Sequence, residues 1–200
     1  MKNKNANKTQ RLKIRTLQDS DLNDVFDIYK DEETCKYLLH NSWNEKNKNE
    51  EFKEKLSKQS LEKDFAINLA CILDDVVIGE INIWNTQMKE CVEIGYCFNP
   101  KYGNKGYATE ALKAVVEYLF INKNIHRIQA NMDARNLVSA KLCEKIGMRR
   151  EAHFIKDFYS KGEWTDSFIY GMLALPPDFT FIIGEWTDSF IYGMLVSDLK

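Results

Sequence analysis

The stretch Tyr102-Gly-Asn-Lys-Gly-Tyr-Ala-Thr-Glu-Ala-Leu112 decides the fold of this chain. It places a short loop with two glycines directly before an amphipathic helix, and it follows the strand-like segment Cys91–Phe98, which stops at Asn99-Pro100. The first N–H groups of a helix lack intrahelical partners, and the helix dipole is positive at that end. The loop is therefore predicted to hold a phosphate or pyrophosphate, with an ordinary glycine-containing helix entry as the alternative.

The segments around this loop alternate between strand and helix patterns. Period-two alternation or short apolar runs predict strands over residues 11–16, 65–73, 76–84, 91–98, 127–132, 148–159 and 164–173. Helical spacing predicts a helix capped by Asp19 or Ser20, a charged surface helix over 45–63, the helix after the loop, and a helix over 136–146 closed by Gly147.

This order of elements predicts a single α+β, or mixed α/β, domain in which helices flank a central twisted mixed sheet. The 200 residues, 44% of them hydrophobic, suffice for one core. We assign the domain to residues 11–173. Residues 1–10 are rich in Lys and Asn and have no apolar segment, which predicts a flexible tail and not a signal peptide or membrane anchor.

Residues 162–173 recur letter for letter as residues 184–195, 22 residues further along the chain. Two identical copies do not make a solenoid, so a recent terminal duplication or an artefact is the better explanation. Only one copy can fill a given strand position, and the first is predicted to do so because it follows its neighbour through a short turn. Residues 174–200 are then a linker with a duplicated strand, which pairs elsewhere, hangs loose, or is exchanged in a homodimer.

Composition excludes several classes of function. The net charge of −2 argues against nucleic acid as the main partner, and no apolar run reaches the roughly 18 residues needed to cross a membrane. The five cysteines contain no C-x-x-C pair and mostly lie in apolar segments, which indicates reduced thiols in a cytoplasmic protein. The three histidines have no metal-ligand spacing.

Several short stretches carry a family resemblance, all in the expected order. They are Ile78-Gly-Glu-Ile81, Val92-Glu-Ile-Gly-Tyr96, Asn99-Pro100, Lys105-Gly-Tyr-Ala-Thr-Glu-Ala-Leu112, Asn136-Leu-Val-Ser139, Glu144-Lys-Ile-Gly-Met148 and Trp164-Thr-Asp166. From Leu12 to Leu173 the chain resembles the GCN5-related N-acetyltransferase (GNAT) family, in its branch nearest the ribosomal-protein serine/alanine N-terminal acetyltransferases. The family loop is written Q/R-x-x-G-x-G/A. Here Gly106 and Ala108 match it, and Gly103 stands at the Q/R position.

The resemblance implies acetyl-coenzyme A as cosubstrate. Its pyrophosphate is expected on the loop amides, and its pantetheine arm beside the strand Cys91–Phe98, which splays from its neighbour in this family. Backbone groups of that strand would then polarise the thioester carbonyl. The implied coenzyme-binding residues are Tyr96, Cys97, Phe98, Gly103, Asn104, Lys105, Gly106, Tyr107, Ala108, Thr109, Asn136 and Ser139.

The expected catalytic residues are Glu93 and Ser139. Glu93 is a carboxylate on an otherwise apolar strand and resembles the base of some family members, although alternation also permits a solvent-facing role; Glu80 is the reserve. Asn136 and Ser139 read as a helix N-cap and a first-turn serine, and the resemblance places Ser139 near the departing thiolate. Cys97 offers a covalent acyl-enzyme as a lesser alternative.

The sequence thus predicts a cytoplasmic N-acetyltransferase in which a primary amine attacks acetyl-CoA directly. The amine expected from the resemblance is the N-terminus of a ribosomal or other protein. A small-molecule amine such as a polyamine or antibiotic is the alternative acceptor, and a non-catalytic acyl-CoA sensor is the alternative function.

Overall fold

A computed structural model describes residues 8–63 and 65–174 of the protein. Its 8-stranded sheet has the order β1-β3-β4-β5-β6-β8-β7, with β2 paired to β3. All neighbours are antiparallel except β5 and β6, which are parallel, so the predicted mixed sheet is confirmed. The strands are β1 (Lys13–Thr16), β2 (Gln59–Ser60), β3 (Ala66–Leu73), β4 (Val76–Asn85), β5 (Cys91–Phe98), β6 (Arg127–Asp133), β7 (Arg149–Ser160) and β8 (Glu163–Leu173).

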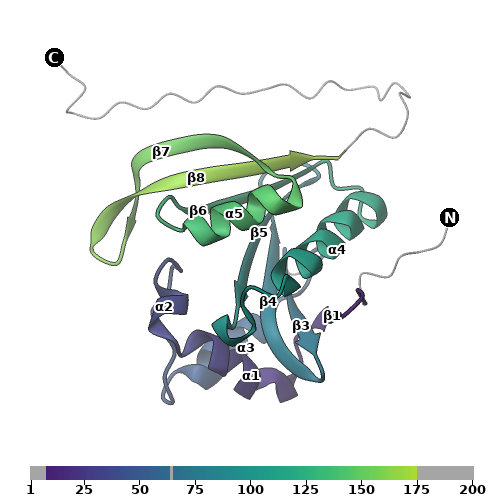
Figure 1. Ribbon diagram of the computed structural model, residues 1–200, viewed down its shortest axis with the longest axis vertical. Coiled ribbons are helices and arrows are strands. Elements are labelled where there is room, and N and C mark those ends of the chain that lie inside the picture. The colour runs from purple at the N-terminus through teal and green to yellow at the C-terminus, as the bar shows by residue number, and fades with distance from the viewer. Residues whose placement is uncertain (1–7, 64, 175–200) are drawn as a thin grey trace.

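Helices cover both faces of the sheet (Figure 1). The longer ones, α4 and α5, pack on one face, and α1 and α3 pack on the other. The helices are α1 (Leu22–Tyr29), α2 (Glu32–Cys35), α3 (Lys48–Leu56), α4 (Tyr107–Asn122) and α5 (Leu137–Ile146), with short 3₁₀ turns η1 (Asp19–Asp21) and η2 (Pro100–Tyr102).

Local sequence explains the sharpest boundaries. The β3–β4 turn places Asp74 and Asp75 at φ of 48° and 64°, the left-handed pair that a two-residue hairpin turn requires. Helix α5 begins where the Asn136 side chain accepts the N–H of Ser139, and it ends at Gly147, whose φ of 97° suits glycine. These residues predict the turn and both helix ends correctly.

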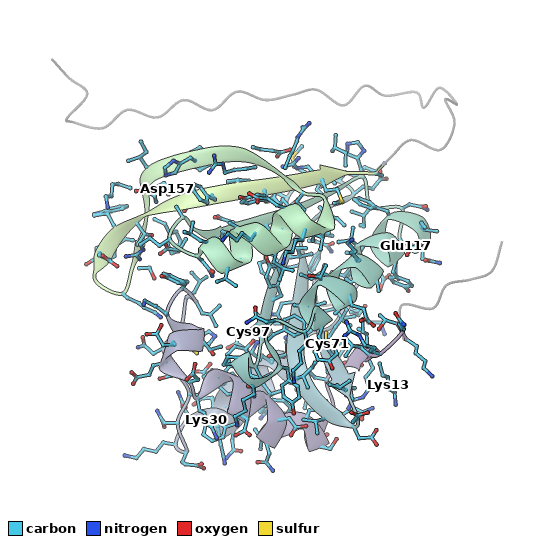
Figure 2. All side chains as sticks on the ribbon, in the orientation of Figure 1. Lys13, Lys30, Cys71, Cys97, Glu117 and Asp157 are labelled. Atoms are coloured by element: carbon cyan, nitrogen blue, oxygen red, sulfur yellow. The ribbon has the colours of Figure 1, made fainter. Side chains whose placement is uncertain are left out.

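The two faces of the sheet bury separate apolar clusters. Alternation along β5 directs Val92 and Ile94 toward α4 and α5, and Cys97 toward α1 and α3. Figure 2 shows Cys71 and Cys97 among the central strands, whereas Lys30 and Asp157 lie at the outside of the molecule. All five cysteines are free and buried.

Three features of the N-terminal half differ from the prediction. Asp19 and Ser20 do not cap a helix but lie inside η1. This turn forms because the Asp21 carboxylate accepts a hydrogen bond from the Gln18 N–H at 2.8 Å and forms an ion pair with the Arg15 guanidinium at 2.6 Å. The helix expected over 45–63 covers only α3, and the chain then turns into β2. The short helix α2 has no apolar periodicity from which it could be predicted.

The ends of the domain also differ from the predicted bounds. Residues 1–7 and 175–200 lie outside the described residues, and so does the second copy of the repeat at 184–195. Thr9, within the stretch expected to be a tail, donates a hydrogen bond to Glu110 at 2.5 Å, so packed structure begins before residue 11. The first copy of the repeat forms β8 between β6 and β7.

The identical copies allow a matched test of which one the sheet uses. Tyr170 in the first copy is 1% exposed, and Tyr192 is its counterpart in the second. We expect Tyr170→Ala to lower the free energy of unfolding by about 3–5 kcal/mol, as for other large buried side chains. Tyr192→Ala should change it by less than about 0.5 kcal/mol. Urea unfolding measures both, and comparable losses from the two variants would show that the copies exchange.

Candidate active site

The site is organised by the separation of β5 from β6. Strand β5 pairs with β4 along its whole length, but with β6 only through Cys91, Val92 and Glu93. Beyond the pair Glu93↔Gln129, and within the described part of the chain, residues 94–98 have no strand on that side. The splay expected from the family resemblance is therefore present, and it leaves backbone donors and acceptors of β5 open to a ligand.

The loop that follows β5, residues 103–106, is the glycine loop. Asn104 and Gly106 adopt left-handed φ of 58° and 80°, and Gly106 is the N-cap of α4. Among the described residues, the N–H groups of 104–109 have no hydrogen-bond acceptor. Adjacent N–H groups at the positive end of a sixteen-residue helix suit a diphosphate, which is the ligand that the sequence predicts here.

Strand β5 and helix α5 meet through Tyr96 and Ser139. The Ser139 hydroxyl donates to the Tyr96 hydroxyl at 2.9 Å, which in turn donates to the Ser139 carbonyl at 3.0 Å. The Cys143 sulfur lies 3.2 Å from the same tyrosine oxygen. Burial raises the pKa of Tyr96, so its proton stays in place at neutral pH. Two predicted coenzyme residues thus form one hydrogen-bonded pair of neutral hydroxyls at the splay.

Glu93 lies on the opposite face of β5 from Tyr96. One of its carboxylate oxygens accepts a hydrogen bond of 2.8 Å from the Gln129 side chain on β6, and the residue is only partly exposed. Beside it, the Trp84 ring covers Gly95 so closely that a Cβ on Gly95 would lie 3.0 Å from it. The predicted catalytic carboxylate is therefore held in one orientation next to an aromatic wall.

A cavity of about 360 Å³, here called the central cavity, opens on this face. Its floor comes from β4, β5 and β6 and includes Glu93, Gly95 and Cys97. Its walls come from residues 36–40 after α2 and from the end of the β7–β8 hairpin. Glu93 therefore faces the central cavity and not the outer surface of the sheet.

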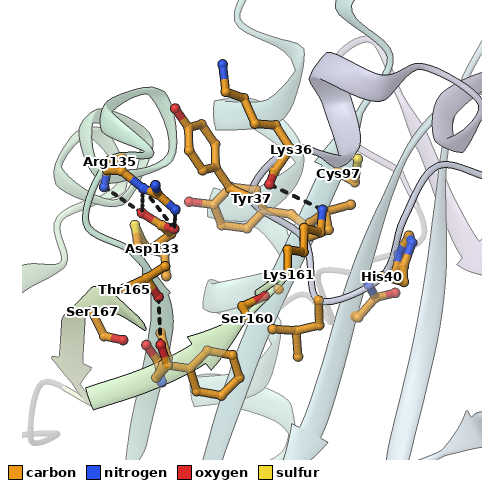
Figure 3. A pocket seen from close by; sticks show the side chains of 18 of the residues that line it. Lys36, Tyr37, His40, Cys97, Asp133, Arg135, Ser160, Lys161, Thr165 and Ser167 are labelled. Carbon is orange, nitrogen blue, oxygen red and sulfur yellow. Dashed lines mark hydrogen bonds and ion pairs between the residues drawn. The ribbon is translucent and has the colours of Figure 1, made fainter. Parts of the chain in front are cut away.

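Ion pairs and hydrogen bonds hold the walls together (Figure 3). Arg135 pairs with Asp133 at 2.7 Å and with Glu163 at 2.8 Å. The Lys161 ammonium donates to the carbonyls of Cys35 at 2.7 Å and Lys36 at 3.3 Å, which joins the β7–β8 turn to α2 across the cavity. Because Lys161 binds carbonyls and not a carboxylate, it leaves a positive charge at the rim.

Glu80, the reserve carboxylate, is placed differently from Glu93. It is fully buried on β4, and its one charged partner among the described residues is Lys55, whose nitrogen lies 3.3 Å away and also donates to Tyr29 at 3.0 Å. Lys55 and Tyr29 line the central cavity, whereas Glu80 does not. Glu93, not Glu80, is thus the carboxylate that reaches the cavity.

Cys97 is poorly suited to a covalent role. Burial raises the pKa of its thiol to about 12, and the negative charge of Glu80 acts in the same direction. A thiol with such a pKa holds its proton at neutral pH and is a weak nucleophile.

Several residues of the site were not predicted from the sequence. The position of Gln129 can be read from the sequence, because alternation along β6 places its side chain on the face away from Ile128 and Ala130, which are buried in the core. Lys55 and Arg135 carry none, since charged residues in polar segments are usually solvated. Two aromatic residues, Trp84 and Tyr29, line the central cavity, whereas Trp43 is buried and stacks on Tyr29 with ring centres 4.8 Å apart.

Comparison with known proteins identifies the fold and its chemistry. The family profile described as the acetyltransferase (GNAT) domain matches residues 11–149. The chain belongs to the GNAT acetyltransferase family. The uncharacterized N-acetyltransferase YnaD of Bacillus subtilis is 36% identical over 167 residues, 82% of this chain and 95% of that relative. A crystal structure of a GNAT acetyltransferase from Bacillus anthracis has a TM-score of 0.76 at 32% identity, covering 84% of this chain and 97% of that one.

A further relative has a named substrate. The ribosomal protein uS5 alanine N-acetyltransferase of Escherichia coli is 31% identical over 87 residues, which is 44% of each chain. The GNAT resemblance read from the sequence motifs is thereby confirmed, and the protein is an acetyl-CoA-dependent N-acetyltransferase. The free N–H groups at the start of α4 and the open edge of β5 fit a ligand with a diphosphate and a long amide-bearing arm.

Two negative observations apply to the described residues of this GNAT protein. Among residues 8–63 and 65–174, no helix has both the length and the apolar character needed to cross a membrane. In the same ranges, no group of three or more His, Cys, Asp or Glu side chains is arranged to hold a metal ion.

The protonation of Cys97 gives a direct test of the covalent alternative. We expect Cys97→Ala to keep kcat within about threefold of the parent enzyme, because direct attack needs no thiolate. Cys91→Ala, at the other end of the same strand, is the matched control. Loss of turnover in Cys97→Ala alone, together with an acetylated intact protein by mass spectrometry, would establish an acyl-enzyme instead.

Proposed function

We propose that this enzyme acetylates the N-terminal amine of a protein, with Glu93 as the base that prepares the amine for attack. The observation that carries the proposal is the position of Glu93, held by Gln129 at the last paired position of β5 and β6 and facing the central cavity. A carboxylate at that position can meet an amine that enters from the cavity while the thioester lies along the open edge of β5.

The coenzyme is assigned to the splayed side of the site. Acetyl-CoA supplies the acetyl group as a thioester, which is activated toward amines. The N–H groups of residues 104–109 would bind its pyrophosphate, and the unpaired edge of residues 94–98 would bind the pantetheine arm. N–H groups on that edge can also stabilise the negative charge that develops on the thioester oxygen, because they are fixed in place before the reaction.

Protons move through side chains on both faces of β5. Glu93 accepts a proton from the amine as the new N–C bond forms. The Ser139 and Tyr96 hydroxyls, already hydrogen bonded to each other, lie on the other face, where they can donate to the sulfur as the C–S bond breaks. The products are an amide and the free thiol of coenzyme A; solvent then takes the proton that Glu93 gained and replaces the one that the hydroxyl pair gave to the sulfur.

The shape of the central cavity favours a peptide as the acceptor. Leu39 and Phe158, on opposite walls, are 78% and 42% exposed, and such apolar side chains suit contact with an extended chain. The positive charge of Lys161 at the rim disfavours a polyamine, which carries several positive charges itself. The similarity to the ribosomal protein uS5 alanine N-acetyltransferase, whose named substrate is a protein, supports the same class.

Glu93→Gln is the central test of the mechanism. Removing the carboxylate should lower kcat at neutral pH by about 10²–10⁴-fold, the usual contribution of a general base. The dissociation constant of CoA should stay unchanged, because Glu93 lies on the cavity side of the strand. Glu163→Gln, which removes another carboxylate from the cavity wall, is the matched control and should lower kcat by less than about threefold. A parallel loss in both variants, or equal activity across pH, would remove Glu93 as the base.

The acceptor class is tested by thiol release from acetyl-CoA. We expect peptides with a free N-terminus to support release, and the same peptides with a blocked N-terminus and no lysine to be inactive. Spermidine and spermine should be poorer acceptors by at least about tenfold in kcat/KM. Preference for the polyamines would assign a small-molecule acceptor, and tight CoA binding with no amine-dependent release would leave a non-catalytic acyl-CoA-binding module.

A further inference from the structure

The N-terminal strand region reaches the glycine loop through one arginine. Arg11, which precedes β1, donates from Nη1 to the Lys105 carbonyl at 2.9 Å and from Nε to Glu110 at 2.6 Å. Its guanidinium carbon lies 4.4 Å from the centre of the Tyr107 ring. The side chain thus contacts the loop and the first turn of α4 at once, across a sequence separation of 94 residues.

The bond to the Lys105 carbonyl fixes a peptide group that belongs to the site. In a trans peptide the C=O and the following N–H point in opposite directions, and all described peptides here are trans. The N–H of Gly106 is therefore directed away from Arg11, among the free N–H groups at the start of α4. Gly106 can adopt many backbone conformations, so without a partner for the Lys105 carbonyl this peptide could rotate.

Arg11 also neutralises the charge of Glu110. Its carboxylate lies in the first turn of α4, where it would repel a diphosphate at the same helix end. It accepts hydrogen bonds from the Arg11 side chain, from the Arg11 backbone N–H at 2.8 Å and from Thr9. These bonds neutralise the charge and turn the carboxylate toward β1, so the helix end stays favourable for an anion.

Within the loop itself, few contacts hold this arrangement. Gly103 has no side chain, and its N–H is used by the Pro100 carbonyl at 2.9 Å. Asn104 has a left-handed φ of 58°, a region that asparagine enters more readily than most non-glycine residues, so this φ does not by itself fix the loop. An external contact at Lys105 therefore decides which way the loop amides face.

We propose that Arg11 is a positioning residue for acetyl-CoA, which locks the Lys105–Gly106 peptide so that the loop amides face the pyrophosphate. The inference rests on the placement of the pyrophosphate at the glycine loop given above. Arg11 acts through the loop and the Glu110 carboxylate, and its effect is confined to donors that carry the pyrophosphate.

The test compares two acyl donors in Arg11→Gln. With acetyl-CoA we expect KM for the donor and the dissociation constant of CoA to rise about tenfold, the loss typical of one hydrogen bond to a charged group. Values of kcat and KM for the amine should stay within about twofold. With acetyl-pantetheine, which ends before the pyrophosphate, kcat/KM should equal that of the parent enzyme. Arg11→Lys, which keeps the charge and one donor to the carbonyl, should recover part of the affinity.

Two controls separate the possible failures. Arg149→Gln removes another exposed arginine that pairs with a carboxylate, Glu151 at 3.0 Å, and should change nothing. Ala108→Pro removes one loop-proximal N–H at a first-turn position where proline is tolerated. If Ala108→Pro raises KM for acetyl-CoA and Arg11→Gln does not, the positioning role of Arg11 is wrong, but the pyrophosphate still binds at the glycine loop. If neither does, the pyrophosphate lies elsewhere. Equal losses with both donors in Arg11→Gln would mean that Arg11 only stabilises the fold.

Discussion

The divergence of β5 from β6 beyond Glu93 and Gln129 is the constraint on which the rest of the site depends. A central strand normally satisfies its backbone on both edges, and leaving one edge open costs free energy unless a ligand or water fills it. Here β4 holds β5 rigidly along its full length, so the open edge keeps its shape. The pantetheine arm of the coenzyme would hydrogen bond to the open edge of β5 as a neighbouring strand would. Coenzyme binding therefore depends directly on the strand arrangement of the sheet.

The two faces of β5 present different side chains to the molecule. On one face, Tyr96 meets Ser139 from α5 in a core that also anchors α4 and the glycine loop. On the other, Glu93 faces the central cavity, whose walls come from residues 36–40 after α2 and from the end of the β7–β8 hairpin. The period of two along the strand therefore places the side chains of Tyr96 and Glu93 on opposite faces of β5. A substitution at an odd-numbered position of β5 should therefore affect the face toward the central cavity, and one at an even-numbered position should affect the face toward Ser139.

Sequence reasoning recovered the elements whose signals are local. The bounds of β5 follow from apolar alternation closed by Asn99-Pro100, and those of α5 from a capping asparagine and a terminal glycine. Contacts between residues far apart in sequence could not be predicted in this way. The bond from Gln129 to Glu93, the contact of Lys55 with Glu80 and the reach of Arg11 to the loop all arise from topology. The motif predicts which residues bind the coenzyme, but it does not indicate which contacts hold those residues in position.

The bridge from Lys161 to the carbonyls after α2 has an evolutionary consequence. It closes the central cavity, the proposed acceptor side, with two short connecting segments, neither of which supplies a residue to the glycine loop or to β5. Such segments tolerate insertion and substitution far better than strands do. Lineages of this enzyme could therefore change their amine by altering the length and charge of these two segments, while the coenzyme machinery is inherited intact.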